Sequence, residues 1–190
     1  MEFFYIRFAR GEGVIMRYIM RAGALYREPN QVVAKLKGVL IGSEKTVHGP
    51  DGVLALKMQI RRTDAAGEQK TDVRSLAYVM VDSLDHEIAI ARPDYAEGDD
   101  PAVVGWPVCR MPHVDHAKID MNGEEYMLIM HNSQNYALMD VSGRTIVQIV
   151  HRGLSGGWNI DSDGHFSPEI LCGFFIFCRY LEQENELILV

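Results

Sequence analysis

The sequence is poor in cysteine and has no hydrophobic run long enough to span a membrane as a helix. Its three cysteines, Cys109, Cys172 and Cys178, cannot all pair, and this odd, sparse count fits a reducing compartment better than a disulfide framework. The most apolar stretch, residues 170–178 (ILCGFFIFC), is nine residues long. Since a transmembrane helix needs about 20 such residues, we expect a buried core segment there, with membrane insertion as the alternative.

The opening residues do not have the form of a secretory leader. In MEFFYIRFARGEG, Arg7 and Arg10 interrupt any apolar core, and no small-residue cleavage site follows. Together with the cysteine count, this pattern predicts a cytoplasmic protein, with peripheral attachment to a membrane surface as an alternative.

Positive charge is also scarce, because 19 Lys and Arg stand against 26 Asp and Glu and give a net charge of −7. Binding to nucleic acid needs an excess of cations, so we expect none. The sequence has no P-loop string and no G-x-G-x-x-G after a strand, which leaves no nucleotide site. Residues 1–40 alone carry a balance of +4, which indicates solvated strand faces or a basic patch for an anionic ligand or lipid surface.

What remains is the composition of a single folded domain spanning residues 1–190, with 47% hydrophobic and 24% charged residues. Short β-rich runs alternate with turn signals along most of the chain. Residues 53–61 are the clearest, since Leu54, Leu56 and Met58 alternate with Lys57 and Gln59. Strands are expected at 2–9, 13–21, 31–41, 53–61, 73–82, 86–92, 116–120, 125–131, 135–140 and 144–151, with shorter ones at 24–27, 105–109, 157–160 and 186–190.

The turns between these runs favour antiparallel pairing. Asn122-Gly123 is a strong hairpin signal, because both central residues of a type I′ turn need positive φ. Residues 93–115 differ, since they hold four of the seven prolines and an acidic cluster. We expect this segment to be an excursion loop within one domain.

Residues near 167–186 predict the one clear helix. Ser167-Pro168-Glu169 combines a capping hydroxyl, a first-turn proline and an acid near the positive end of the helix dipole. The following residues are apolar all round, so the helix has to be buried all round. Strands at this density form a sandwich or a barrel, and a barrel of twelve strands has a radius of roughly 12 Å, wide enough to need a helix inside. The sequence therefore predicts a mainly β fold: a closed antiparallel barrel of about twelve strands around a central apolar C-terminal helix.

One family shares this arrangement. Residues 143–181 (GRTIVQIVHRGLSGGWNIDSDGHFSPEILCGFFIFCRYL) run from an acidic turn through Trp158 into the apolar helix. In this ending, and in the hairpins from residue 13 onward, the chain resembles the tubby-like superfamily, which includes the tubby C-terminal domain, LURP-one-related proteins and phospholipid scramblases. The resemblance implies a twelve-stranded barrel around a helix, and binding of phosphoinositides or other anionic lipids.

The residues that would bind such a ligand are chosen here by charge alone. Lys57, Arg61 and Arg62 are the basic side chains near one strand end, and we take them as the candidate ligand site. A non-enzymatic binding module without a cofactor is the first hypothesis, since no nucleophile, base or metal set stands at credible spacing. The ligand would be a phosphoinositide, another anionic lipid headgroup or a small anionic molecule.

Two alternatives stay open. Cys109, His113 and His116 are residue types that bind zinc, and they would have to hold the metal of a hydrolase. A structural scaffold that binds a protein partner, through a strand edge or the 93–115 loop, is the other alternative. Gly153–Gly157 matches G-x-S-x-G, but no helix is expected directly after it, so we interpret it as a turn.

Overall fold

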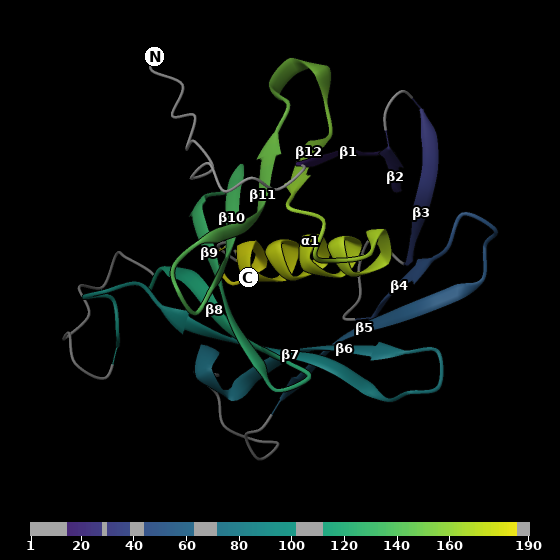
Figure 1. Ribbon diagram of the computed structural model, residues 1–190. Coiled ribbons are helices and arrows are strands. Elements are labelled where there is room, and N and C mark those ends of the chain that lie inside the picture. Colours follow the sequence, from purple (N-terminus) through teal and green to yellow (C-terminus); the bar gives the residue numbers. More distant parts are fainter. Residues whose placement is uncertain (1–14, 28–29, 39–43, 63–71, 102–111, 186–190) are drawn as a thin grey trace, which may run out of the picture.

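The computed structural model describes residues 15–27, 30–38, 44–62, 72–101 and 112–185 of the 190-residue chain. Twelve strands form a closed barrel in which every strand pairs antiparallel with its neighbour in sequence, and β1 closes the barrel against β12 (Figure 1). Closure leaves no strand edge free among these twelve. The predicted fold class is thereby confirmed.

The strands are short and follow one another around the barrel. They are β1 (Met16–Arg21), β2 (Ala24–Arg27), β3 (Gln31–Gly38), β4 (Lys45–His48), β5 (Leu54–Arg62), β6 (Leu76–Asp82), β7 (Glu87–Tyr95), β8 (Val114–Met121), β9 (Glu124–Asn132), β10 (Asn135–Asp140), β11 (Thr145–His151) and β12 (Trp158–Ser162). Two 3-10 turns, η1 (Val73–Ser75) and η2 (Gly153–Ser155), and one helix, α1 (Pro168–Gln183), complete the described elements.

Helix α1 lies inside the barrel, where it fills the lumen (Figure 1). It starts as the sequence predicts, because the Ser167 hydroxyl accepts a hydrogen bond from the Ile170 amide (3.4 Å) and Pro168 occupies the first turn. Ten of its residues are buried, and they form one core with the inward side chains of the strands. Gly173 lets the helix approach the wall, since a Cβ there would lie 2.4 Å from the Met80 methyl group.

The connections alternate between the two ends of the barrel. The β4–β5, β6–β7, β8–β9 and β10–β11 turns lie at the end where α1 begins, and we name it the helix-entry end. Asn122 (φ 53°) and Gly123 (φ 84°) form the predicted hairpin turn there. At the opposite, helix-exit end, the Asn185 side chain forms two hydrogen bonds with the Val114 backbone (2.8 and 2.9 Å) and fixes the end of α1 to β8.

Several boundaries differ from those expected. Strand β7 continues through Pro93 to Tyr95 and β8 begins at Val114, so the excursion between them is shorter than 93–115. Pro93 is buried and paired with Ala117, since the fixed φ of proline is compatible with an extended chain. Strand β4 was not predicted, because its four residues hold a single apolar side chain, Val47, and show no period. Residues 73–75 form the turn η1 and not a strand start.

Other expectations meet the structure differently. The G-x-S-x-G string forms η2, followed by strand β12, so the predicted turn is confirmed. The strands expected at 2–9, 105–109 and 186–190 lie outside the described residues. In the described part of the chain, no helix has the length and apolar character needed to cross a membrane.

Candidate functional site

The predicted basic residues lie on β5, but two of them form ion pairs with acidic residues of the neighbouring β6–β7 hairpin. Lys57 and Arg61 project from its outer face. The Lys57 Nζ atom lies 2.6 Å from Asp85 Oδ1, and the Arg61 Nη1 atom lies 2.8 Å from Glu87 Oε2. Both acids stand beyond β6, in the β6–β7 turn and at the start of β7, so each ion pair reaches across β6 on the outside of the barrel.

The two ion pairs border an apolar patch on the outer face of β6. Ala77, Val79 and Val81 form a second buried apolar cluster there, packed against Ile90. The long stems of Lys57 and Arg61 pass above these small side chains and shield them from water. Arg62, the last residue of β5, falls on the opposite face and has an interaction partner of its own. The three cations therefore do not converge on one ligand position, and an anion would have to displace two carboxylates.

The candidate zinc residues are only partly described. The His116 Nδ1 atom lies 2.7 Å from Asp115 Oδ1, next to it on β8. His113 precedes the strand, and Cys109 lies outside the described residues. Among the residues that are described, no three His, Cys, Asp or Glu side chains gather closely enough to hold a metal ion.

A hollow of about 590 Å³ lies on the outer face of the barrel over β7 to β10, and we name it the outer groove. Four of its residues stand in one row across four strands, because Arg92 pairs with Lys118, Lys118 with Met127, and Met127 with Met139. The row thus places two cations beside two methionines. Sequence reasoning missed this row, since its members are 47 residues apart at the extremes and meet only through the register of the sheet.

The two cations of the outer groove are directly opposite each other. Like charges in such a cross-strand pair destabilise a sheet. Neither Arg92 nor Lys118 forms an ion pair with any residue in the described ranges, and both are exposed. Asp120 and Glu125 also line the groove, but one Asp120 oxygen already accepts the Gly123 amide hydrogen (3.1 Å).

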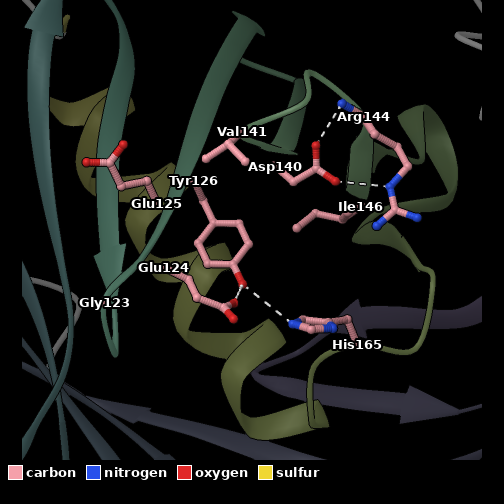
Figure 2. Close-up of a pocket in the computed structure, with 9 residues that line it drawn as sticks. All are labelled: Gly123, Glu124, Glu125, Tyr126, Asp140, Val141, Arg144, Ile146 and His165. Carbon is pink, nitrogen blue, oxygen red and sulfur yellow. Dashed lines mark hydrogen bonds and ion pairs between the residues drawn. The ribbon is translucent and has the colours of Figure 1, made fainter.

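A second hollow of about 470 Å³ opens at the helix-entry end, between the β8–β9 and β10–β11 hairpins and the loop that leads into α1. We name it the rim hollow. Figure 2 shows Glu124, Tyr126 and His165 converging at one side of it, while the Glu125 carboxyl points away. The Tyr126 hydroxyl donates to Glu124 Oε2 (2.5 Å), and His165 Nε2 lies 3.5 Å from the same hydroxyl oxygen. Since the single Tyr126 proton goes to Glu124, the His165 contact requires a proton on Nε2.

The other side of the rim hollow is an ion pair that belongs to the β10–β11 turn. Asp140 accepts hydrogen bonds from the Ser142 hydroxyl, the Ser142 and Arg144 amides, and Arg144 Nε, at 2.6 to 3.0 Å. These bonds, first among them that of the Ser142 hydroxyl, lower the pKa of Asp140 to about 2. Asp140 and Arg144 thus neutralise each other, and Glu124 supplies the uncompensated charge.

Tyr126 is held as a neutral phenol. Burial raises its pKa to about 12, and the hydrogen bond and negative charge of Glu124 add to the effect. Its ring packs edge-on against Phe166 (5.6 Å between centroids), which in turn packs against Phe174 of the helix. The rim hollow therefore has a rigid floor continuous with the core. The rim hollow was not predicted from the sequence. The Asn122-Gly123 and Ser142-Gly143 turns were the available signal, because turns separated by two antiparallel strands lie at the same end of a barrel.

Comparison with protein-family models gives no match, and comparisons with curated proteins and solved structures give no significant match. The two hollows are therefore the candidate sites in the described part of the chain.

Proposed function

We propose that this protein is a non-enzymatic binding module for an anionic ligand with an apolar part, held in the outer groove. The ligand class is an anionic lipid headgroup, phosphoinositides included, or a small anionic molecule. The observation that carries the proposal is the pair Arg92 and Lys118, two exposed cations placed opposite each other without an acid partner in the described chain. A bound anion would remove their repulsion.

Because the lumen is filled, a binding site on the outside of the barrel is favoured. Helix α1 fills it, and the large side chains along the helix, such as Phe174, Phe177 and Tyr180, are completely buried. Both hollows accordingly lie at the surface, one on the wall and one at the rim. A ligand would approach from solvent or from a membrane surface without entering the barrel.

The composition of the groove narrows the ligand. A guanidinium and an ammonium group together suit a phosphate or carboxylate, and the half-buried Met127 and Met139 give an adaptable apolar surface beside them. Asp120 and Glu125 on the same hollow would repel an extended polyanion. We therefore favour a compact anionic group joined to an apolar body over a nucleic acid.

The resemblance to the tubby-like superfamily supports this proposal, because tubby domains bind phosphoinositides or other anionic lipids. It does not fix the residues. Lys57 and Arg61, our first candidates, are engaged with Asp85 and Glu87, so Arg92 and Lys118 take their place in the proposal.

The test is co-sedimentation with phosphatidylcholine vesicles, with and without a phosphoinositide, at low and moderate salt. We expect salt-sensitive binding to the anionic vesicles, and a tenfold or greater loss of it in Lys118→Glu. Lys37→Glu is the matched control, since Lys37 is an exposed cation on β3, on another side of the barrel.

A parallel titration with a soluble inositol phosphate separates the two ligand sources. Binding to vesicles alone would indicate a lipid, while binding to both would indicate recognition of the headgroup. Equal losses in the Lys118 and Lys37 variants would show unspecific charge attraction and overturn the proposed site. No binding to either probe would overturn the function.

A further inference from the structure

Next to the outer groove, with which it shares Tyr126, Asp140 and Val141, we infer that the rim hollow is a docking site for a protein partner, and that it receives a lysine or arginine side chain flanked by apolar residues. The inference joins three features of the helix-entry end: a preformed hollow, an uncompensated carboxylate inside it, and an exposed apolar side chain at its edge.

The hollow is preformed, because tight hairpin turns form its walls and buried core residues form its floor. The β10–β11 turn is fixed by four hydrogen bonds to Asp140, and the β8–β9 turn is the two-residue Asn122-Gly123 hairpin. The floor consists of Tyr126 and Ile146, which are 8% and 2% exposed. A partner would therefore meet a shaped site without having to order a loop, which lowers the cost of binding.

The charge of the hollow selects a cation. The charges of Asp140 and Arg144 cancel. The Arg144 Nη2 atom also lies 3.8 Å from Asp163 Oδ2, so this arginine interacts with two carboxylates of the protein itself. Glu124 has no cationic partner among the described residues, and its hydrogen-bond partner is the neutral Tyr126 hydroxyl. A guanidinium or ammonium group beside Glu124 would complete a charge-assisted hydrogen bond over an aromatic floor.

The edge of the hollow supplies an apolar contact. Val141, at the tip of the β10–β11 hairpin, is 82% exposed and lines the hollow. Protein interfaces combine such a contact with a central charged or aromatic anchor. An anionic headgroup fits this hollow less well than the outer groove, because the hollow is lined by Glu124 and not by Arg92 or Lys118.

The experiment uses three blocked tripeptides as probes, with backbone amide shifts of the full chain as the readout. They are acetyl-Leu-Arg-Leu-amide, the same peptide with citrulline in place of arginine, and the same peptide with glutamate. Citrulline keeps the shape of arginine and removes its charge. We expect the arginine peptide to shift the amides of Gly123, Glu124 and Ile146, the citrulline peptide to bind about tenfold more weakly, and the glutamate peptide to leave these amides unshifted.

Matched variants locate the charge and the apolar contact. Glu124→Gln keeps an oxygen for the Tyr126 hydroxyl, so it removes the charge without removing that hydrogen bond; we expect affinity for the arginine peptide to fall about fivefold to tenfold. Glu97→Gln, the same change at an exposed site near the helix-exit end, is its control. Val141→Ser should weaken binding about twofold to threefold, while Leu154→Ser, at the fully exposed tip of η2, should not.

Any of three other outcomes would overturn the inference. It fails if the arginine peptide shifts none of the rim amides, if the glutamate peptide shifts them equally, or if Glu124→Gln and Glu97→Gln behave alike. Shifts of the rim amides on addition of phosphatidylcholine vesicles, without a response to the peptide, would assign this end to a membrane instead. The outer groove is tested separately by Lys118→Glu, because Lys118 lines that groove and not the rim hollow.

Discussion

At the scale of single residues, two buried tyrosines facing each other in the lumen have unequal roles. The Tyr180 hydroxyl donates to the Met58 carbonyl oxygen (3.3 Å), and its ring lies 5.4 Å from that of Tyr78. The Tyr78 hydroxyl is buried and has no hydrogen-bond partner among the described residues. Burial raises the pKa of Tyr78, and the nearby Glu184 carboxylate adds to the effect, although no hydrogen bond of normal geometry joins the two groups.

This difference gives opposite predictions for two identical substitutions. Tyr78→Phe removes an unpaired buried hydroxyl and should raise the free energy of unfolding by about 1 kcal/mol. Tyr180→Phe removes a hydroxyl that is hydrogen-bonded and should lower the free energy of unfolding by about 1 kcal/mol. Urea unfolding of the two variants beside the parent chain measures both. A loss of stability in Tyr78→Phe would mean that its hydroxyl has a partner in the folded protein.

At the scale of elements, the hairpins at the helix-entry end depend on backbone conformation and on single carboxylates. Gly123 has φ of 84°, and a Cβ built on it would meet no atom within 4 Å. A side chain there would therefore be strained by the backbone and not by a clash.

We accordingly predict that Gly123→Val lowers the free energy of unfolding by about 1–2 kcal/mol, because a β-branched residue disfavours the left-handed region. Gly123→Asn should cost clearly less, since asparagine tolerates this region. Melting temperatures of the two variants measure the difference. Equal melting temperatures for Gly123→Val and the parent chain would contradict the turn assignment.

The β10–β11 hairpin should respond to pH through Asp140. The pKa of this carboxyl is lowered from its ordinary value of 3.8 to about 2 by its hydrogen bonds in the folded chain. The stabilisation is thus complete above pH 3.8 and is lost as the pH falls toward 2.

Asp140→Asn should therefore destabilise the protein at pH 6, by on the order of 1 kcal/mol after allowance for partial exposure, and much less at pH 2. Urea unfolding of both proteins at these two pH values gives the comparison. A difference that stays constant between them would show that the charge of Asp140 contributes nothing.

At the scale of the whole molecule, stability depends on the fit between α1 and the barrel wall. Phe174 is completely buried in the lumen, and Gly173 faces Met80 and Met58 of the wall. A charged side chain at position 174 would be removed from water, and a larger side chain at position 173 would have no space.

Phe174→Asp should prevent folding, because an unpaired carboxylate would be buried inside the barrel. Gly173→Leu should lower the free energy of unfolding by several kcal/mol through overpacking, on the order of 3 kcal/mol. Gly173→Ala is the control. The flexible Met80 methyl group is able to move away from a single added Cβ, and alanine favours a helix over glycine by about 1 kcal/mol. Circular dichroism and thermal unfolding report all three. A soluble Phe174→Asp protein that melts cooperatively would contradict a helix inside the barrel.

Local patterns in the sequence were enough for most of this architecture. The period of two in β5, the Asn122-Gly123 turn and the capping residues before α1 each depend on neighbours in the chain. The all-apolar helix then required walls on every side, which favoured a large closed barrel. Strand β4 and the extension of β7 past Pro93 were missed, because one is too short to show a period and the other contains a residue that usually ends strands.

The candidate sites were decided by the tertiary structure. The sequence by itself determined which residues are cationic, which strands alternate and that a buried helix fills the core. Only the pairing of neighbouring strands placed Asp85 and Glu87 within reach of Lys57 and Arg61, and aligned Arg92, Lys118, Met127 and Met139 in one row. The physical reason is that pairing register and diagonal contacts across strands depend on residues on different strands, so the electrostatic partner of a side chain becomes defined only when the strands pair.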